Sequence, residues 1–150
     1  VQRIRPLGWH LVVHLDAADI PEVSTLLRTL PVPFVIDHMG RVKADGGREQ
    51  RPFRALLDLM KLETCWVKVC GAERVSTAGP PFLDAVPFAR AIINAAPDRV
   101  LWGTDWPHPN VGRFMPNDGD LVDLVSEIAP DELQREKLLV QNPANLYGWA

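Results

Sequence analysis

The sequence predicts an α/β fold in which parallel strands alternate with helices, as in half of a (β/α)8 TIM barrel. Four short apolar runs, which we interpret as strands, begin at residues 9, 33, 66 and 100. Helical patterns, and not hairpin turns, occupy the chain between one run and the next. Such alternation is typical of βαβ units and of a parallel sheet, and about four units make half of an eightfold barrel.

Two of the four expected strands, the first and the last, carry apolar residues on both faces. Leu11-Val12-Val13 in the first strand and Val100-Leu101-Trp102 in the last would suit strands that are covered on both sides. A complete four-stranded open sheet would instead carry charges or prolines on its outer strands. We therefore expect further strands outside this sequence. The four strands are expected at Trp9 to Leu15, Pro33 to His38, Trp66 to Gly71 and Val100 to Asp105.

The predicted helices carry start signals or an apolar stripe. In the first, Asp19 is the expected N-cap and Pro21 stands in the first turn. The second begins near Pro52, and its apolar residues recur at i, i+3, i+4 and i+7. Further helices are expected from about Pro87 to Ala96, from Leu121 to Ile128, and from Asp131 to Val140 between Pro130 and Pro143.

Composition excludes several classes of function. Of 150 residues, 47% are hydrophobic and 23% charged, which is the balance of an ordinary soluble domain. The net charge is -3 and no block of Lys or Arg occurs, so we expect no nucleic-acid or membrane partner. The N-terminus is not a signal peptide, and we expect a cytoplasmic protein with a small-molecule substrate. Cys65 and Cys70 lack metal or redox spacing and are expected to be free buried thiols.

Polar residues stand at or near the end of each expected strand: His14, His38, Lys68 and Asp105. In barrel enzymes the carboxyl ends of the strands form the rim that carries the active site. Each residue has an ordinary interpretation when taken singly. A histidine can be a hydrogen-bonded structural residue, Asp105 a turn or cap residue, and Lys68 or Arg74 a surface charge. Their recurrence at one end of successive strands favours a functional site.

The alternation of side chains along a strand predicts which of these residues share a face. His38 is expected on the face of Phe34 and Ile36, opposite Asp37. Lys68 and Cys70 are expected on one face of the third strand, and Asp105 on the face of Leu101 and Gly103 in the fourth.

Several motifs, in order along nearly the whole chain, are shared with one enzyme family. Asp-His-Met-Gly (residues 37–40) and Gly-Thr-Asp-Trp-Pro-His-Pro (residues 103–109) are the most specific of them. The others lie at residues 6–10, 66–70, 73–76, 115–119 and 138–148. Together these motifs resemble the 2-pyrone-4,6-dicarboxylate lactonase branch of the amidohydrolase superfamily. The resemblance implies that residues 1–150 form the C-terminal half of a barrel like those of the metal-dependent hydrolases.

The resemblance also implies a hydrolase that opens a small carboxylated lactone by attack of an activated water. By position, Asp105 is similar to the aspartate that takes a proton from water, and His38 to the histidine that polarises the lactone carbonyl. Arg74 is similar to an arginine that binds a substrate carboxylate, as suits its planar guanidinium. His14 stands where the family usually has a tyrosine. Together with Lys68 it is expected to contact the substrate.

The sequence also bears on whether the enzyme needs a metal and on whether this chain is active. The lactonase branch works without a metal, and where metal-dependent relatives place further histidines this chain has Lys68 and Cys70. No cofactor is therefore expected, with a divalent metal such as zinc as the alternative. The superfamily's His-x-His pair has no counterpart in this sequence. A metal-dependent decarboxylase or amidohydrolase, and an inactive truncated fragment, remain alternative functions. The open outer strands predict self-association.

Overall fold

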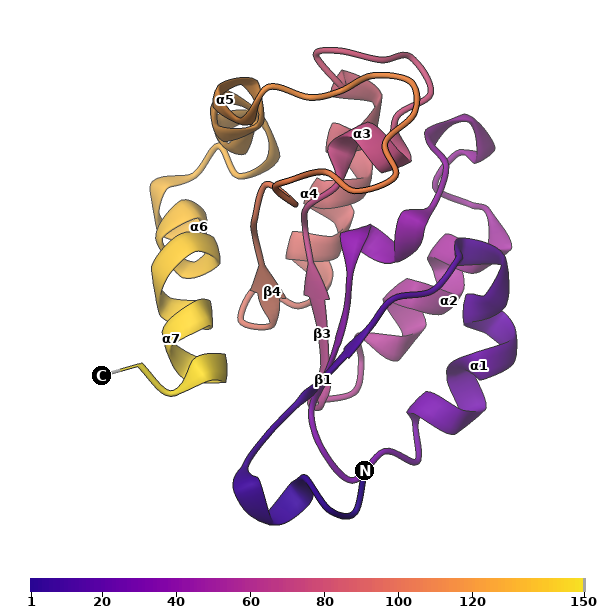
Figure 1. Cartoon of the computed structure of the whole chain (residues 1–150), viewed down its shortest axis with the longest axis vertical. Coiled ribbons are helices and arrows are strands. Elements are labelled where there is room, and N and C mark those ends of the chain that lie inside the picture. The colour runs from indigo at the N-terminus through magenta and orange to yellow at the C-terminus, as the bar shows by residue number, and fades with distance from the viewer. Residues whose placement is uncertain (150) are drawn as a thin grey trace.

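Four parallel strands form a single sheet in the part of the chain that the computed structural model describes, residues 1–149 (Figure 1). The strands follow one another in chain order, so each pairs with the next, and the predicted α/β fold class is confirmed. They are shorter than predicted. The strands are β1 (Leu11–Val13), β2 (Phe34–Ile36), β3 (Cys65–Lys68) and β4 (Val100–Leu101).

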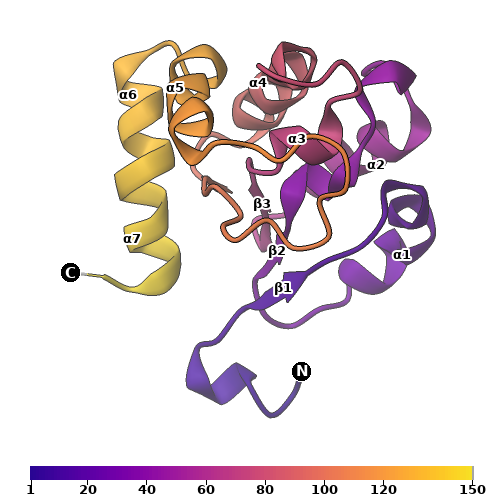
Figure 2. The ribbon, with the colours of Figure 1, turned by 45° about the horizontal axis from the view of Figure 1, so that its top comes forward.

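Helices lie in an arc along one side of the sheet, as in the outer ring of a barrel (Figure 2). The arc runs from α1 past α2 and α4 to the helices at the C-terminal end of the chain. The helices are α1 (Ile20–Leu27), α2 (Arg51–Leu59), α3 (Ala72–Val75), α4 (Val86–Ala95), α5 (Asp118–Ile128), α6 (Glu132–Glu136) and α7 (Asn142–Tyr147).

The core lies between the sheet and this arc of helices. Phe34 and Ile36 of β2 are fully buried, as is Phe53 of α2, whose ring packs edge-on against Phe88 of α4 at 4.9 Å. Burying a side chain of this size contributes about 1.5–3 kcal/mol. The opposite face of the sheet is open at its β1 edge, because Val12 is 53% exposed. We expected both faces of the first strand to be buried, but the described residues cover only one face of β1.

Asp19 is the N-cap residue of α1, as predicted, but its side chain makes no capping hydrogen bond, because its backbone is already helical as part of a short 3-10 turn before α1. The predicted end of the last helix is wrong. The last helix does not end before Pro143. A π-helical turn over Lys137–Gln141 joins α6 to α7, and Pro143 lies in the first turn of α7. The wider turn accommodates a residue that lacks an N–H group.

The connection from β4 to α5 crosses the end of the sheet at which the strands terminate (Figures 1 and 2). It ends at Asn117, which caps α5 by accepting a hydrogen bond from the Gly119 N–H at 2.8 Å. This loop therefore covers the end of the sheet at which the candidate functional residues lie. None of the helices described within residues 1–149 has the length and apolar character needed to cross a bilayer.

Candidate active site

The chain leaves strand geometry at the residues predicted to be functional. β2 ends at Ile36, Asp37 is still extended, and His38 adopts a left-handed backbone with a φ of 50°. The prediction that His38 shares a face with Phe34 and lies opposite Asp37 is wrong, because strand alternation does not extend to His38. Positive φ is strained for residues with a Cβ, and such strain concentrates at functional sites.

Three polar groups lie close to one carboxylate oxygen of Asp37. Its Oδ1 accepts a hydrogen bond from the His38 backbone N–H at 3.1 Å, lies 3.2 Å from Lys68 Nζ, and lies 3.5 Å from Cys70 Sγ. Burial alone would raise the pKa of Asp37, but the charges of Lys68 and His38 lower it on balance. Lys68 and Cys70 therefore reach the same atom, as expected of residues on one face of β3.

Asp105 is bound by an arginine. It follows β4 with a φ of 70°. Arg74, in the short helix α3, donates from Nε and Nη2 to Asp105 Oδ2 at 2.8 and 2.6 Å, and Nη2 also donates to the Pro109 carbonyl at 2.8 Å. The Arg74 side chain is only 10% exposed, so the interpretation as a surface charge is excluded. Oδ1 of Asp105 is turned the other way, towards His38.

His38 lies between the two aspartates. Its Nε2 is 3.7 Å from Asp37 Oδ2 and 3.7 Å from Asp105 Oδ1. Burial lowers the pKa of His38, and the charge of Arg74 adds to this effect, although the two carboxylates oppose it. The side chain is therefore a neutral imidazole at neutral pH, with one ring nitrogen directed at a pair of carboxylates.

The two further candidates lie beside this centre. The His14 ring packs edge-on against the His38 ring at 5.1 Å, and His14 Nε2 is 3.3 Å from Arg41 Nη1. Lys68 reaches the centre through Asp37, whose charge raises the Lys68 pKa although burial opposes it. The structure thus brings all five predicted residues to one rim, at the carboxyl ends of the strands.

Comparison with known proteins assigns the chain to a family. The amidohydrolase family profile matches residues 1–149. The chain belongs to the amidohydrolase family. It is 46% identical to a 4-sulfomuconolactone hydrolase of Hydrogenophaga intermedia, over 99% of this chain and 50% of that protein. It is also 46% identical to a 2-pyrone-4,6-dicarboxylate hydrolase of Comamonas testosteroni, over 97% of this chain and 50% of that protein.

Solved amidohydrolases share the fold. A "probable 2-pyrone-4,6-dicarboxylic acid hydrolase" of Acinetobacter baumannii, solved with citric acid bound, superposes with a TM-score of 0.86 at 25% identity. The match covers 99% of this chain and 55% of that one. An amidohydrolase of Burkholderia multivorans with bound zinc has a TM-score of 0.78 at 21% identity, over 97% and 54% of the two chains. The chain thus spans about half the length of the relatives it matches.

Some side chains at this rim are of types that can bind a metal ion. Two groups of three side chains lie with ligand atoms within 4.8 Å of one another: Asp37, His38 and Cys70, and Glu73, Asp105 and His108. In the first group the Lys68 ammonium already lies 3.2 Å from Asp37 Oδ1, and burial raises the pKa of the Cys70 thiol well above its ordinary value. In the second a guanidinium occupies Asp105 Oδ2. One aspartate oxygen of each group is therefore already paired with a positive side chain, and the other oxygen faces His38.

Four residues of the amidohydrolase site were not predicted from the sequence. Side-chain alternation predicts Asp37 on the face opposite His38, and the cysteine spacing predicts no more than a free buried thiol for Cys70. Glu73 and His108 lie in the segments after β3 and β4, and both are buried. Neither oxygen of Glu73 accepts a hydrogen bond from a described residue, although Arg74 Nε is 3.4 Å from its Oε1. The available signal was their presence in the shared motifs, because no strand periodicity reaches them.

Proposed function

We propose that the complete protein opens a small carboxylated lactone with water, and that this chain supplies the C-terminal half of its barrel. The supporting observation is that Asp105 Oδ1 and His38 Nε2 lie 3.7 Å apart at the carboxyl ends of the strands, beside Arg74. A base next to a neutral donor is what attack of water on a carbonyl requires. The relatives named as lactone or pyrone hydrolases, at 46% identity, agree with this chemistry.

In the proposed reaction Asp105 takes a proton from water, and the resulting hydroxide oxygen bonds to the lactone carbonyl carbon. His38 stabilises the negative charge that develops on the carbonyl oxygen by donating a hydrogen bond from Nε2. The bond from the carbonyl carbon to the ring oxygen then breaks, and the ring oxygen takes up the proton that Asp105 removed from water, which returns Asp105 to its carboxylate form. Arg74 binds a carboxylate of the substrate, and Nη1, which makes no hydrogen bond to a described residue, is the group available for it.

Lys68 and His14 complete the proposed substrate pocket. Lys68 Nζ lies beside Asp37 on the face of the sheet that carries the site, and it adds positive charge for an anionic substrate. His14 packs on His38, where it limits the space beside the carbonyl. We propose that no metal takes part, because Lys68 and Arg74 already neutralise the two aspartates. The two free thiols agree with a reducing cytoplasm.

The test is hydrolysis by the complete protein. We expect the complete protein to open the ring of 2-pyrone-4,6-dicarboxylate or 4-sulfomuconolactone. The reaction is monitored by the loss of ultraviolet absorbance. Prior treatment with a chelator should leave its rate unchanged. Failure to open any carboxylated lactone would refute the proposal. Activity restored by zinc after chelation would favour the alternative, a metal-dependent decarboxylase or amidohydrolase.

The isolated 150-residue chain is proposed to self-associate and to lack turnover. Its β1 side exposes Leu7, Trp9 and Val12, which are 58%, 61% and 53% exposed, next to an edge strand that has only one partner in the described sheet. Apolar edges of this kind recruit other chains. Light scattering run beside a lactone assay tests both claims. A monodisperse monomer would contradict the first and measurable turnover the second.

A further inference from the structure

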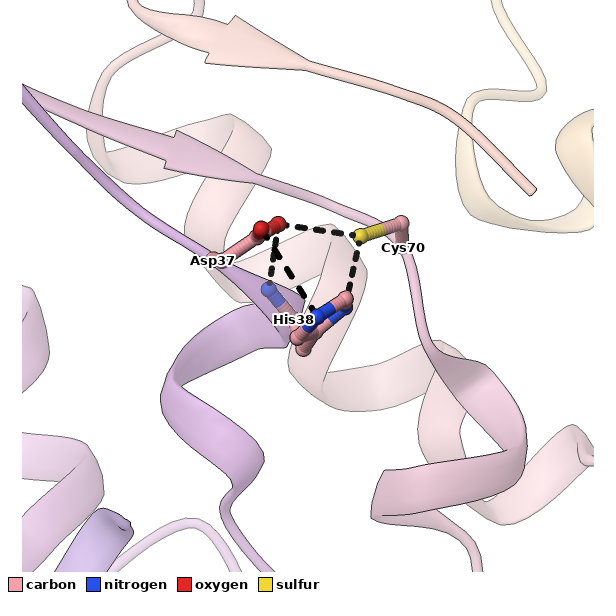
Figure 3. A group of neighbouring side chains, drawn as sticks. All are labelled: Asp37, His38 and Cys70. Carbon is pink, nitrogen blue, oxygen red and sulfur yellow. Dashed lines mark hydrogen bonds and ion pairs between the residues drawn. The ribbon is translucent and has the colours of Figure 1, made fainter. Parts of the chain in front are cut away.

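The Cys70 thiol is the direct partner of the His38 ring. Cys70 Sγ lies 3.2 Å from Nδ1 of His38, and the contact is buried (Figure 3). Cys70 itself is 4% exposed. The next residue, Gly71, has a φ of +70°, and a Cβ there would lie 3.1 Å from His38 Cβ and 3.2 Å from its Nδ1. The backbone after Cys70 thus packs closely against the imidazole, and a side chain at position 71 would be strained and would crowd the His38 ring.

Both partners of this contact are neutral, which limits the hydrogens they can share. Burial lowers the pKa of His38 and raises that of Cys70, so the imidazole carries one N–H and the thiol keeps its S–H. Two arrangements are then possible. Either the S–H donates to Nδ1 and the imidazole hydrogen is on Nε2, or Nδ1–H donates to sulfur and the S–H turns to Asp37 Oδ1, 3.5 Å away.

The surroundings of Nε2 distinguish these arrangements. Nε2 is 3.7 Å from an oxygen of Asp37 and 3.7 Å from an oxygen of Asp105. A hydrogen on Nε2 would point its positive end at two carboxylates, whereas a lone pair would face two negative charges. Asp37 Oδ1 already has two nearer donors, the His38 backbone N–H at 3.1 Å and Lys68 Nζ at 3.2 Å. A third hydrogen bond from the Cys70 thiol would therefore add little to its stabilisation.

We propose that Cys70 is a positioning residue whose S–H donates to Nδ1 of His38 and so fixes the tautomer that carries its hydrogen on Nε2. The hydrogen bond at one ring nitrogen sets which form the other takes. The consequence for catalysis rests on the proposed lactone hydrolysis, because only the Nε2–H form can donate to the carbonyl oxygen. The tautomer itself does not depend on that function.

The tautomer can be read by NMR on the complete, folded protein, without an activity assay. Couplings from the ring carbon-bound protons to the two ring nitrogens distinguish the forms. The His38 signals are those lost in His38→Asn. We expect the Nε2–H form in the wild type and a mixture in Cys70→Ala. Cys65→Ala is the matched control, because Cys65 is an equally buried thiol of β3 whose Sγ contacts only the Trp66 carbonyl, at 4.0 Å.

Kinetics of the complete protein supply the second readout. Cys70→Ala is expected to lower kcat about tenfold or more with little change in KM, and Cys70→Ser, which keeps a donor, to recover the Nε2–H form and part of the rate. A wild-type His38 in the Nδ1–H form would overturn the proposal even if no variant folded. So would an unchanged tautomer in Cys70→Ala, or a serine variant that behaves like the alanine variant. A protein with the Nε2–H form but without lactonase activity would refute the function alone.

Discussion

Asp37 and Asp105 both follow a strand of the same sheet and both face His38, yet their environments differ. Asp37 directs one oxygen to the His38 backbone N–H and to Lys68, within a cluster that also includes Cys70. Asp105 gives one oxygen to Arg74 and leaves the other facing His38. Each aspartate leaves its other oxygen 3.7 Å from His38 Nε2, so the two differ in the cation that holds the first oxygen, an ammonium at Asp37 and a guanidinium at Asp105. Position at a strand end therefore does not by itself identify the base.

The largest expected effect is that of Asp105→Asn in the complete protein. The amide keeps the shape and the hydrogen bond from Arg74 but cannot take a proton from water. We expect kcat to fall by at least about a hundredfold, since removal of a general base commonly costs 10²–10⁴-fold, with little change in substrate binding. Steady-state kinetics measure both. Near-normal turnover would remove Asp105 from the mechanism.

Arg74→Met should act mainly on binding. A hydrogen bond to a charged group contributes about 1.5–3 kcal/mol, so KM for a carboxylated lactone should rise roughly tenfold to a hundredfold. The variant should bind the acid about as weakly as the wild type binds the neutral ester. Arg74→Lys is the control, because it keeps the charge but not the planar fork. An unchanged preference for the acid would show that Arg74 serves only Asp105.

Asp37→Asn should have a smaller effect on turnover. Its amide oxygen can still accept hydrogen bonds from the His38 backbone and from Lys68, and only the charge is lost. We expect kcat to fall by about tenfold or less. If kcat instead fell as far as in Asp105→Asn, Asp37 would be the stronger candidate for the base, and the distinction between the two aspartates would fail.

The sheet and most helices could be predicted because their signals are local. Apolar runs give the strands, and the i, i+3, i+4, i+7 stripe near Pro52 gives α2, whose residues Phe53, Leu56 and Leu59 are fully buried. The π-helical turn before Pro143 could not be predicted in this way, because proline usually marks the end of a helix. Its accommodation depends on backbone geometry that no residue pattern states.

The site was predictable only up to the ends of the strands. His38 and Lys68 were found because a polar residue in an apolar run is conspicuous. Asp37 was misplaced, since alternation assumes a strand and the chain turns left-handed at His38. The contact between Arg74 and Asp105 joins residues 31 positions apart on different βα units. Such pairing follows from the parallel pairing of β3 with β4 and from the path of the chain after each strand, which sequence spacing does not encode.

The smallest expected effect concerns Glu73, which borders the Arg74–Asp105 pair from the other side. Its side chain is fully buried, and burial raises the pKa of Glu73 above its ordinary value of 4.5, with the charge of Asp105 adding and that of Arg74 opposing. The folded state therefore holds this proton more tightly than the unfolded state. The stability it contributes is complete below pH 4.5 and is lost as the pH rises through the folded-state pKa.

Glu73→Gln keeps the shape but cannot ionise, so its free energy of unfolding should lack this fall. We expect the variant to be more stable than the wild type at pH 8, and the difference to shrink towards pH 4. Urea unfolding of the complete protein at several pH values measures this, with exposed Glu63→Gln as the control. A variant less stable than the wild type at pH 8 would mean that Arg74 holds Glu73 ionised. Arg74 would then divide its charge between two carboxylates, and Asp105 would be less firmly bound than the hydrogen-bond distances indicate.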